Sequence, residues 1–184
     1  GQNNVQGACD MGALFNTLPG YSGLENDDVF DRYEKMWQVT LPRRKGKAAT
    51  EVWDAILEDE IHGLYVFGED PVLADPNAHH AVKALEKLNF MIVQDIFLTE
   101  TAKMADVVFP AACYAEKDGT FTCTERRVQR VRKAVNPPGE AKPDWQIFKE
   151  FSQRMGYAMN YSKPEDVFDE VTQLMPQYGG ITYA

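Results

Sequence analysis

The sequence predicts an α/β fold: a Rossmann-like three-layer domain with a short parallel sheet flanked by helices, followed by a less regular C-terminal α+β extension. Three short apolar runs, at residues 64–67, 90–93 and 106–109, are separated by helical patterns. Continuous apolar runs are typical of strands buried on both faces. Strands that alternate with helices join one parallel sheet through right-handed crossovers.

The segments before the first run are expected to be an irregular arm and two helices. Glycines interrupt residues 1–24 repeatedly, which favours an arm without regular structure. Asn26 is a good N-cap for a helix with an apolar stripe. A second amphipathic helix begins at Thr50, and Gly63 is expected to end it.

Between and after the runs, the same patterns predict further elements. Residues 77–88 and 99–104 favour helices, and residues 117–120 favour a hairpin turn. The basic residues 126–133 are interpreted as a strand whose charged face meets the acidic remainder of the protein, with an anionic partner as the alternative. Helices are expected from Asp144 to Gly156 and from Pro164.

These elements suggest three regions. Residues 1–24 form the arm, residues 25–112 the Rossmann-like nucleotide-binding domain, and residues 113–184 the extension.

Composition excludes several classes of function. The chain has 184 residues and a formal net charge of −9, which argues against general nucleic-acid binding. No apolar run approaches the roughly 20 residues of a membrane span. Cys9, Cys113 and Cys123 form no C-x-x-C motif and are expected to be buried structural thiols. The adjacent His79 and His80 cannot face each other on a helix, so no metal site is predicted.

Polar side chains follow the first two apolar runs. Glu69 and Asp70 come after the first, and Gln94 and Asp95 close the second. Ligands of open parallel sheets bind beyond the carboxyl ends of the strands. A carboxylate there can accept hydrogen bonds from the N1–H and amino group of a guanine, or from ribose hydroxyls. Acidic residues at strand ends also cap helices, so a structural role stays open.

Seven segments, in order along almost the whole chain, resemble catalytic (alpha) subunits of formate dehydrogenases, in the DMSO reductase family of molybdopterin oxidoreductases. They are GQNNVQGACDMG (1–12), GEDP (68–71), VQDIFLTETA (93–102), ADVVFPA (105–111), EKDGT (116–120), ERRVQ (125–129) and KPDW (142–145).

The resemblance implies an enzyme that interconverts formate and carbon dioxide, with molybdenum or tungsten held by two pterin guanine dinucleotides. It places the strand-end residues at the guanosine end of one dinucleotide, assigns two later residues to the same cofactor, and puts Gln2 in the loop beside the metal and the substrate pocket. The cofactor-binding residues so implied are Glu69, Asp70, Gln94, Asp95, Lys117 and Asp144.

The chain also departs from the family pattern. It lacks the cysteine motif for a [4Fe–4S] cluster and the Cys or selenocysteine that binds the metal. With no initiator Met, it is expected to be an internal fragment that is inactive, contains at most half of one dinucleotide site and carries no whole cofactor alone. Residues 113–184 are then expected to pack toward the missing iron–sulfur domain.

The implied partners are the remaining domains of the subunit, an iron–sulfur electron-transfer subunit or carrier, and formate. The expected location is the cytoplasm, with a periplasmic parent enzyme left open. Two alternatives stay open: another molybdopterin oxidoreductase, such as a nitrate reductase, and a free-standing nucleotide-binding or interaction module.

Overall fold

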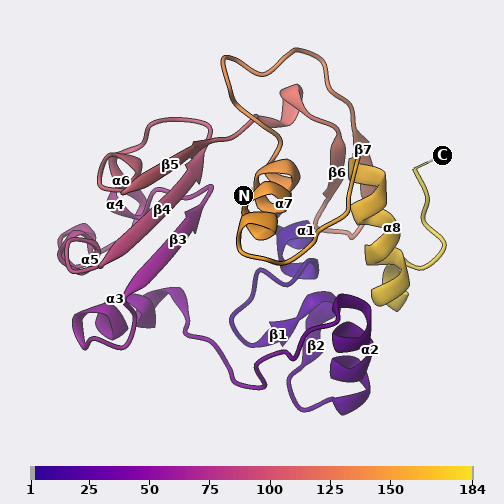
Figure 1. Cartoon of the computed structure of the whole chain (residues 1–184), viewed down its shortest axis with the longest axis horizontal. Coiled ribbons are helices and arrows are strands. Elements are labelled where there is room, and N and C mark those ends of the chain that lie inside the picture. Colours follow the sequence, from indigo (N-terminus) through magenta and orange to yellow (C-terminus); the bar gives the residue numbers. More distant parts are fainter. Residues whose placement is uncertain (1–2, 184) are drawn as a thin grey trace. The chain divides into compact units, whose positions relative to one another are not determined.

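The computed structural model describes residues 3–183, which form two compact units (Figure 1). Unit 1 contains the described residues up to Lys47, then Asp118–Arg132, and the described residues from Asn160 onward. Unit 2 contains Ala48–Lys117 and Lys133–Met159. Each unit is therefore assembled from segments that are distant in sequence.

Unit 2 is built on a parallel sheet of three strands in the order β3–β4–β5. The strands are β3 (Gly63–Phe67), β4 (Phe90–Asp95) and β5 (Val107–Pro110). Their register places Phe67 opposite Gln94 and Asp95 opposite Pro110. The three predicted strands are confirmed, and their carboxyl ends meet at one edge of the sheet.

Helices cover both faces of this sheet, as expected for three layers. One face packs against α3 (Ala49–Leu57), α5 (Ala78–Leu85) and α6 (Glu100–Lys103), with the short α4 (Pro71–Ala74) beside them. The other face meets α7 (Asp144–Arg154), where the Tyr65 ring stacks on Phe148 at a centroid distance of 5.7 Å. The 3₁₀ turn η2 (Tyr114–Glu116) follows the sheet.

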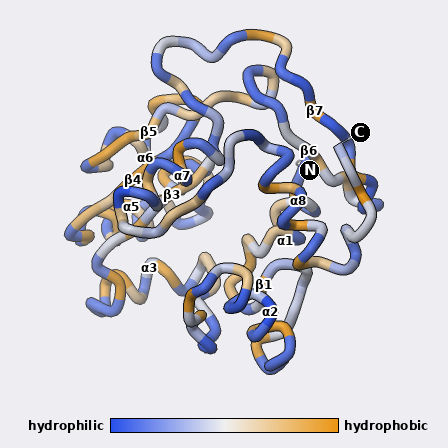
Figure 2. The backbone as a smooth tube through the Cα atoms, turned by 45° about the vertical axis from the view of Figure 1, so that its right-hand side comes forward, coloured by the Kyte–Doolittle hydropathy of each residue, from blue (hydrophilic) through white to orange (hydrophobic). Residues whose placement is uncertain are grey.

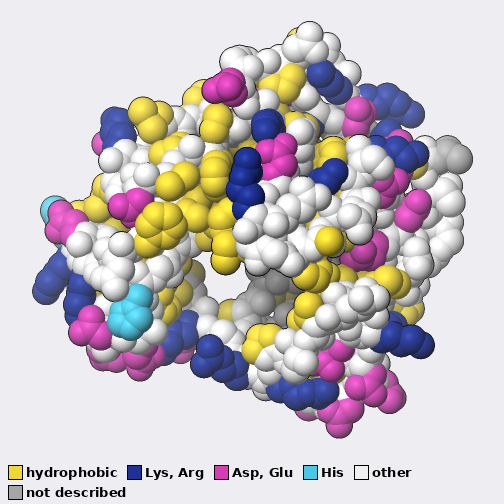
Figure 3. All heavy atoms as spheres, in the orientation of Figure 1, with side chains coloured by type: hydrophobic (Ala, Val, Ile, Leu, Met, Phe, Trp, Pro, Cys, Tyr) yellow, Lys and Arg dark blue, Asp and Glu magenta, His cyan; other side chains and the backbone are white. Residues whose placement is uncertain are grey.

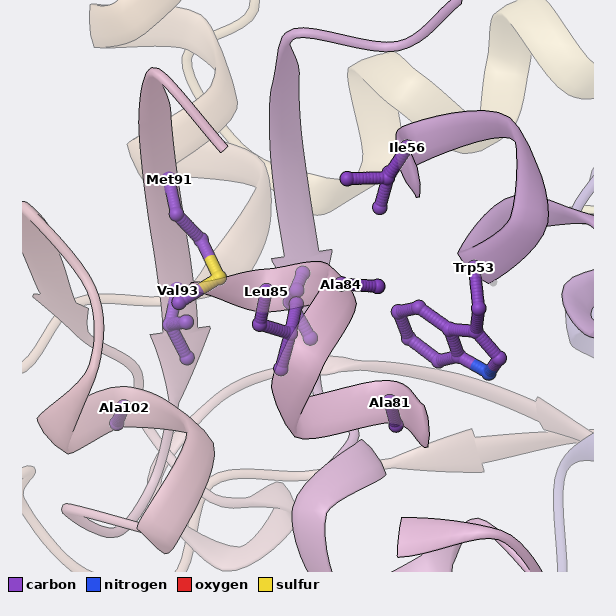
Figure 4. Packing of buried hydrophobic residues seen from close by; sticks show 9 residues of the cluster. Trp53, Ile56, Ala81, Ala84, Leu85, Met91, Val93 and Ala102 are labelled. Carbon is purple, nitrogen blue, oxygen red and sulfur yellow. The ribbon is translucent and has the colours of Figure 1, made fainter. Parts of the chain in front are cut away.

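The main core of unit 2 lies between the sheet and α3, α5 and α6. Figure 4 shows Trp53 and Ile56 of α3 directed toward Ala84 and Leu85 of α5, with Met91 of β4 close by. Hydrophobic residues are concentrated along the three strands (Figure 2). Burial of each large apolar side chain contributes roughly 1.5–3 kcal/mol, which makes this core the main source of stability in the unit.

The predicted cap Asn26 is confirmed, because its side chain accepts a hydrogen bond from the amide of Val29 in α2 (Asp27–Trp37). The side chains of Asn77 and Thr99 accept hydrogen bonds from the first turns of α5 and α6.

The end of α3, in contrast, differs from the prediction. Helix α3 ends at Leu57, and Asp59 takes the left-handed conformation there with a φ of 61°. Gly63 is instead the first residue of β3, so its predicted role as a helix stop is wrong.

Unit 1 combines short helices with two small antiparallel strand pairs. Its elements are α1 (Val5–Asp10), β1 (Thr17–Leu18), η1 (Pro19–Tyr21), β2 (Ser22–Gly23), α2 (Asp27–Trp37), β6 (Gly119–Thr122), β7 (Val128–Val131), α8 (Pro164–Leu174) and η3 (Pro176–Tyr178). Its core joins residues of α2, α8 and η3, including Tyr33, Phe168 and Tyr178.

The structure corrects two expectations in unit 1. The arm is not wholly irregular, because residues 5–10 form α1. The hairpin turn lies at residues 123–127, where Arg126 has a φ of 59°, while Gly119 already pairs with Val131. Within the basic strand, Arg130 pairs with Glu165 at 3.4 Å, in line with a charged face that meets acidic residues.

The units do not follow the expected division into residues 1–24, 25–112 and 113–184. Helix α2 packs in unit 1, whereas the sheet with which it was grouped belongs to unit 2. Helix α7, assigned to the extension, belongs to unit 2. The cause is that its aromatic residues complete the second face of the sheet, which local sequence patterns do not reveal.

Two further observations concern the surface. The three cysteines are free and only partly buried, so the expectation of buried thiols is wrong. Among residues 3–183, none of the helices has the length and apolar character needed to cross a membrane.

Candidate functional site

The candidate site is the edge of unit 2 at which the parallel strands end. The amide of Gly68 donates to the carbonyl of Gln94 at 2.9 Å, and the amide of Ala111 donates to the carbonyl of Asp95 at 2.9 Å. These bonds keep the ends of neighbouring strands aligned. Gly68 has a φ of +64°, which a residue with a Cβ would adopt only with strain. The turn therefore directs Glu69 and Asp70 away from β3 at this edge.

Two carboxylates at the edge are available to a ligand. Glu69 is exposed and, within the described part of the chain, forms no hydrogen bond or ion pair. Asp95 is half-buried, and its Oδ1 accepts from the amide of Phe97 at 3.1 Å. Each retains free acceptor capacity, because a carboxylate offers about four lone-pair positions.

Asp70 has a different environment from its neighbour. Its Oδ1 accepts hydrogen bonds from the Thr101 hydroxyl at 2.6 Å and from the Thr101 amide at 3.1 Å. The Thr101 hydroxyl in turn accepts from the amide of Val72 at 3.1 Å. Asp70 thus ties the loop after β3 to the start of α6.

Gln94 lies inside the unit rather than on its surface. Its side chain is fully buried on the face of β4 that meets α7. Its Oε1 accepts from the Tyr65 hydroxyl at 2.6 Å, and its Nε2 donates to Asp144 Oδ1 at 2.8 Å. The side chain of Gln94 therefore has no exposed surface at this edge.

The chain of contacts continues to Lys117. The ammonium of Lys117 donates to Asp144 Oδ2 and to the carbonyl of Ala112, the latter at 2.7 Å. Asp144 is the first residue of α7, where the helix dipole favours a negative charge. The Lys117 and Asp144 side chains are each 23% exposed. The structure therefore brings Gln94, Lys117 and Asp144 into one polar network.

Sequence reasoning missed Tyr65, the fourth member of this network. Burial, followed by the negative charge of Asp144, raises the pKa of the Tyr65 hydroxyl above its ordinary value of 10.0. The signal available was a single phenol within a buried apolar run, since a buried hydroxyl requires a hydrogen-bond partner.

Three further observations bear on the site. Gln2 lies outside the described residues. Among those described, no group of three or more His, Cys, Asp or Glu side chains could hold a metal ion. Figure 3 shows hydrophobic side chains gathered over the strands of unit 2 and charged ones over α3 and α5.

The fold and the edge place unit 2 among open α/β domains, whose ligands bind at the carboxyl ends of parallel strands. The chain belongs to the molybdopterin oxidoreductase family, whose model matches residues 1–154. Membership of this family implies a molybdopterin cofactor and its metal.

Two relatives match the chain over its whole length. It is 56% identical over 185 residues to the F420-dependent formate dehydrogenase subunit alpha of Methanocaldococcus jannaschii. It is 50% identical over 186 residues to the F420-dependent formate dehydrogenase 2 subunit alpha of Methanococcus maripaludis. In both comparisons the match covers 100% of this chain and 27% of the relative, so the chain spans about a quarter of their length.

A solved structure supports the fold. Acetylene hydratase from Pelobacter acetylenicus matches with a TM-score of 0.60 and 18% sequence identity, over 84% of this chain and 22% of that protein.

Proposed function

We propose that this chain is part of the catalytic subunit of a formate dehydrogenase, in which unit 2 binds the nucleotide end of a pterin guanine dinucleotide. The names of the two methanogen relatives support formate as the substrate. The observation that carries the binding site is the pair of accessible carboxylates, Glu69 and Asp95, at the ends of adjacent parallel strands.

The residues at this edge suit a guanosine chemically. Guanine presents N1–H and amino donors, and the ribose presents hydroxyls, so both need acceptors such as Glu69 and Asp95. A pyrophosphate is anionic and needs a donor or a cation, such as the ammonium of Lys117. Asp70 and Gln94 contribute by holding these groups in place.

In the proposed reaction, formate loses a proton and two electrons to become carbon dioxide. When bound, the cofactor with molybdenum or tungsten would supply the two-electron acceptor. The role proposed for this chain is to hold and orient the nucleotide. Gln2 would border the substrate pocket.

The remaining expectations belong to the same proposal. The other domains of the subunit would supply a [4Fe–4S] cluster, toward which residues 113–184 would pack. An iron–sulfur subunit or carrier would take the electrons, and the enzyme would work in the cytoplasm. The isolated chain would be catalytically inactive.

The binding site can be tested with the chain itself. We expect amide NMR shifts around Glu69 and Asp95 on titration with GDP, and smaller ones with ADP, because adenine lacks the N1–H and 2-amino donors. Asp95→Asn should abolish the preference for GDP. Asp59→Asn is the matched control, because Asp59 precedes β3 and so lies toward the opposite edge of the sheet.

Equal shifts for GDP and ADP, or a GDP preference that survives Asp95→Asn, would contradict the assigned guanosine site. In a full-length subunit, the corresponding aspartate substitution should lower the cofactor content, measured as released guanine nucleotide per protein.

A further inference from the structure

We propose that Tyr65 is a positioning residue of the nucleotide site: through Gln94 and Asp144, its hydroxyl fixes the ammonium of Lys117 at the carboxyl end of β5. This inference depends on the proposed function in one respect only, which is the identity of the ligand that Lys117 contacts. The geometry of the network stands independently of that ligand.

The direction of every hydrogen bond in the network is determined. The Asp144 carboxylate, paired with the Lys117 ammonium, can only accept. Gln94 must therefore present its amide nitrogen to Asp144, at 2.8 Å. Its oxygen then faces the opposite way and needs a donor, which the Tyr65 hydroxyl supplies at 2.6 Å.

Packing leaves this arrangement little freedom. The Tyr65 ring stacks on Phe148 and meets the edge of Phe151 at 5.8 Å, with Phe109 at 6.4 Å. Gln94 is fully buried, so bulk water cannot replace a missing partner. Burial also strengthens each bond, because the local dielectric is lower than in water.

The network ends where a ligand of the sheet would lie. Lys117 donates one proton to Asp144 and one to the carbonyl of Ala112, two residues beyond the end of β5. An ammonium group has three protons, so one is left for an anionic ligand once these two acceptors, the only ones that residues 3–183 provide, are counted. With two protons held by fixed acceptors, the position of the charge is set before the ligand arrives, which lowers the entropy lost on binding.

Removing the hydroxyl should disturb the network stepwise. Without it, the Gln94 oxygen is a buried acceptor without a donor, which is unfavourable. If the amide turns to find another partner, its oxygen faces Asp144, and the two acceptors repel. Asp144 then holds Lys117 less firmly. An ordinary tyrosine pKa, about 10, already keeps the hydroxyl protonated, and hence a donor, at neutral pH. Burial raises the pKa of Tyr65 further.

The experiment is a double-mutant cycle on the full chain with GDP as the probe. We expect Tyr65→Phe to weaken GDP binding roughly five- to tenfold, the equivalent of about one hydrogen bond. In the Lys117→Met background, Tyr65→Phe should change the Kd less than about twofold, because the coupled partner is already gone. A purely structural effect of Tyr65 would persist in both backgrounds.

The matched control is Tyr33→Phe. Tyr33 is also a buried tyrosine, but its hydroxyl donates to the carbonyl of Pro19 in unit 1 at 3.1 Å. This variant removes the same atom without touching the network and should leave GDP binding unchanged.

A second readout needs no nucleotide. The ¹⁵N ammonium resonance of Lys117 should be visible and slowly exchanging in the wild-type chain, and should broaden by water exchange in Tyr65→Phe but not in Tyr33→Phe. If wild type fails to bind GDP, the proposed function fails, while this resonance still decides whether Tyr65 positions Lys117. An unchanged resonance, or an equal effect of Tyr65→Phe on GDP affinity in both backgrounds, overturns the inference.

Discussion

Glu69 and Asp70 show how two adjacent carboxylates can have separate roles. Both follow β3 at the same edge, and both were predicted to contact the cofactor. The structure engages Asp70 with Thr101, a side chain that is fully buried, and leaves Glu69 exposed. The difference arises from the approach of α6, which brings Thr101 to one carboxylate only.

This difference predicts that two alanine substitutions affect different properties, one the stability and the other the affinity for GDP. Asp70→Ala should lower the free energy of unfolding by about 1–3 kcal/mol, because Thr101 loses a buried acceptor. Glu69→Ala should change it by less than about 0.5 kcal/mol but weaken GDP binding. Urea unfolding and GDP titration of both variants test this pair. Equal losses of stability would show that Asp70 has no special structural role.

At the scale of the element, α1 depends on a glycine for an unusual reason. A Cβ on Gly7 would lie 2.2 Å from Asn4 Oδ1, a distance that real atoms do not reach. Asn4 Oδ1 occupies this space while it accepts a hydrogen bond from the amide of Thr122 at 2.9 Å. The glycine thus permits a bond that joins α1 to β6.

We therefore expect the usual sign of a helical Gly→Ala substitution to reverse. Alanine ordinarily stabilises a helix interior by roughly 0.5–1 kcal/mol relative to glycine. Gly7→Ala would instead displace Asn4 and leave the buried Thr122 amide unpaired, at a cost of about 1–3 kcal/mol. Urea unfolding should show net destabilisation.

The Asn4→Ala background provides the control for this prediction. There the obstacle is absent, so Gly7→Ala should be neutral or stabilising. Destabilisation by Gly7→Ala of similar size in both backgrounds would mean that Asn4 is not the cause.

Helix α8 carries a pH-dependent cap. The carboxylate of Asp166 accepts from the amide and hydroxyl of Ser162 and from the amide of Lys163. The Ser162 amide bond, followed by the hydroxyl bond, lowers the pKa of Asp166 below its ordinary value of 3.8. Since the folded pKa is lowered, the stabilisation is present above the unfolded pKa and is lost as the pH falls through the folded value.

Comparison with Asp166→Asn tests this cap. Wild type should be more stable than the variant at neutral pH, and the difference should shrink as the pH falls below about 4. Urea midpoints measured across this range provide the readout. A difference independent of pH would exclude the carboxylate charge as the cause.

At the scale of the whole molecule, buried phenols should set the alkaline limit of stability. Among the described residues, burial is the largest cause that raises the pKa values of four tyrosines above 10.0: Tyr33, Tyr65, Tyr178 and Tyr183. Above that pH the unfolded chain releases protons that the folded chain retains. The free energy of unfolding should therefore fall as the pH rises beyond about 10.

Urea midpoints and tyrosinate absorbance, followed together up to about pH 11, test this expectation. A constant midpoint while tyrosinate forms at its ordinary pH would show that these phenols titrate without unfolding.

Much of unit 2 could be predicted because its signals are local. Apolar runs and the order of strands and helices each lie within a few residues of the elements that they specify. The site residues were only partly predictable. Gln94 meets Asp144 across 50 positions and Tyr65 across 29, and no periodicity reports such pairs.

The sequence by itself determined the family, the parallel sheet and the acidic residues at its carboxyl edge, because these depend on local composition and on motif order. Only the tertiary structure decided that Glu69 faces solvent, that Asp70 holds Thr101, and that Gln94 belongs to a buried network. It also decided that α7 covers the sheet and that the Tyr65 hydroxyl bonds to Gln94. The physical reason is that a side chain acquires its role from the groups that folding brings within hydrogen-bond distance, and those groups lie far away in the chain.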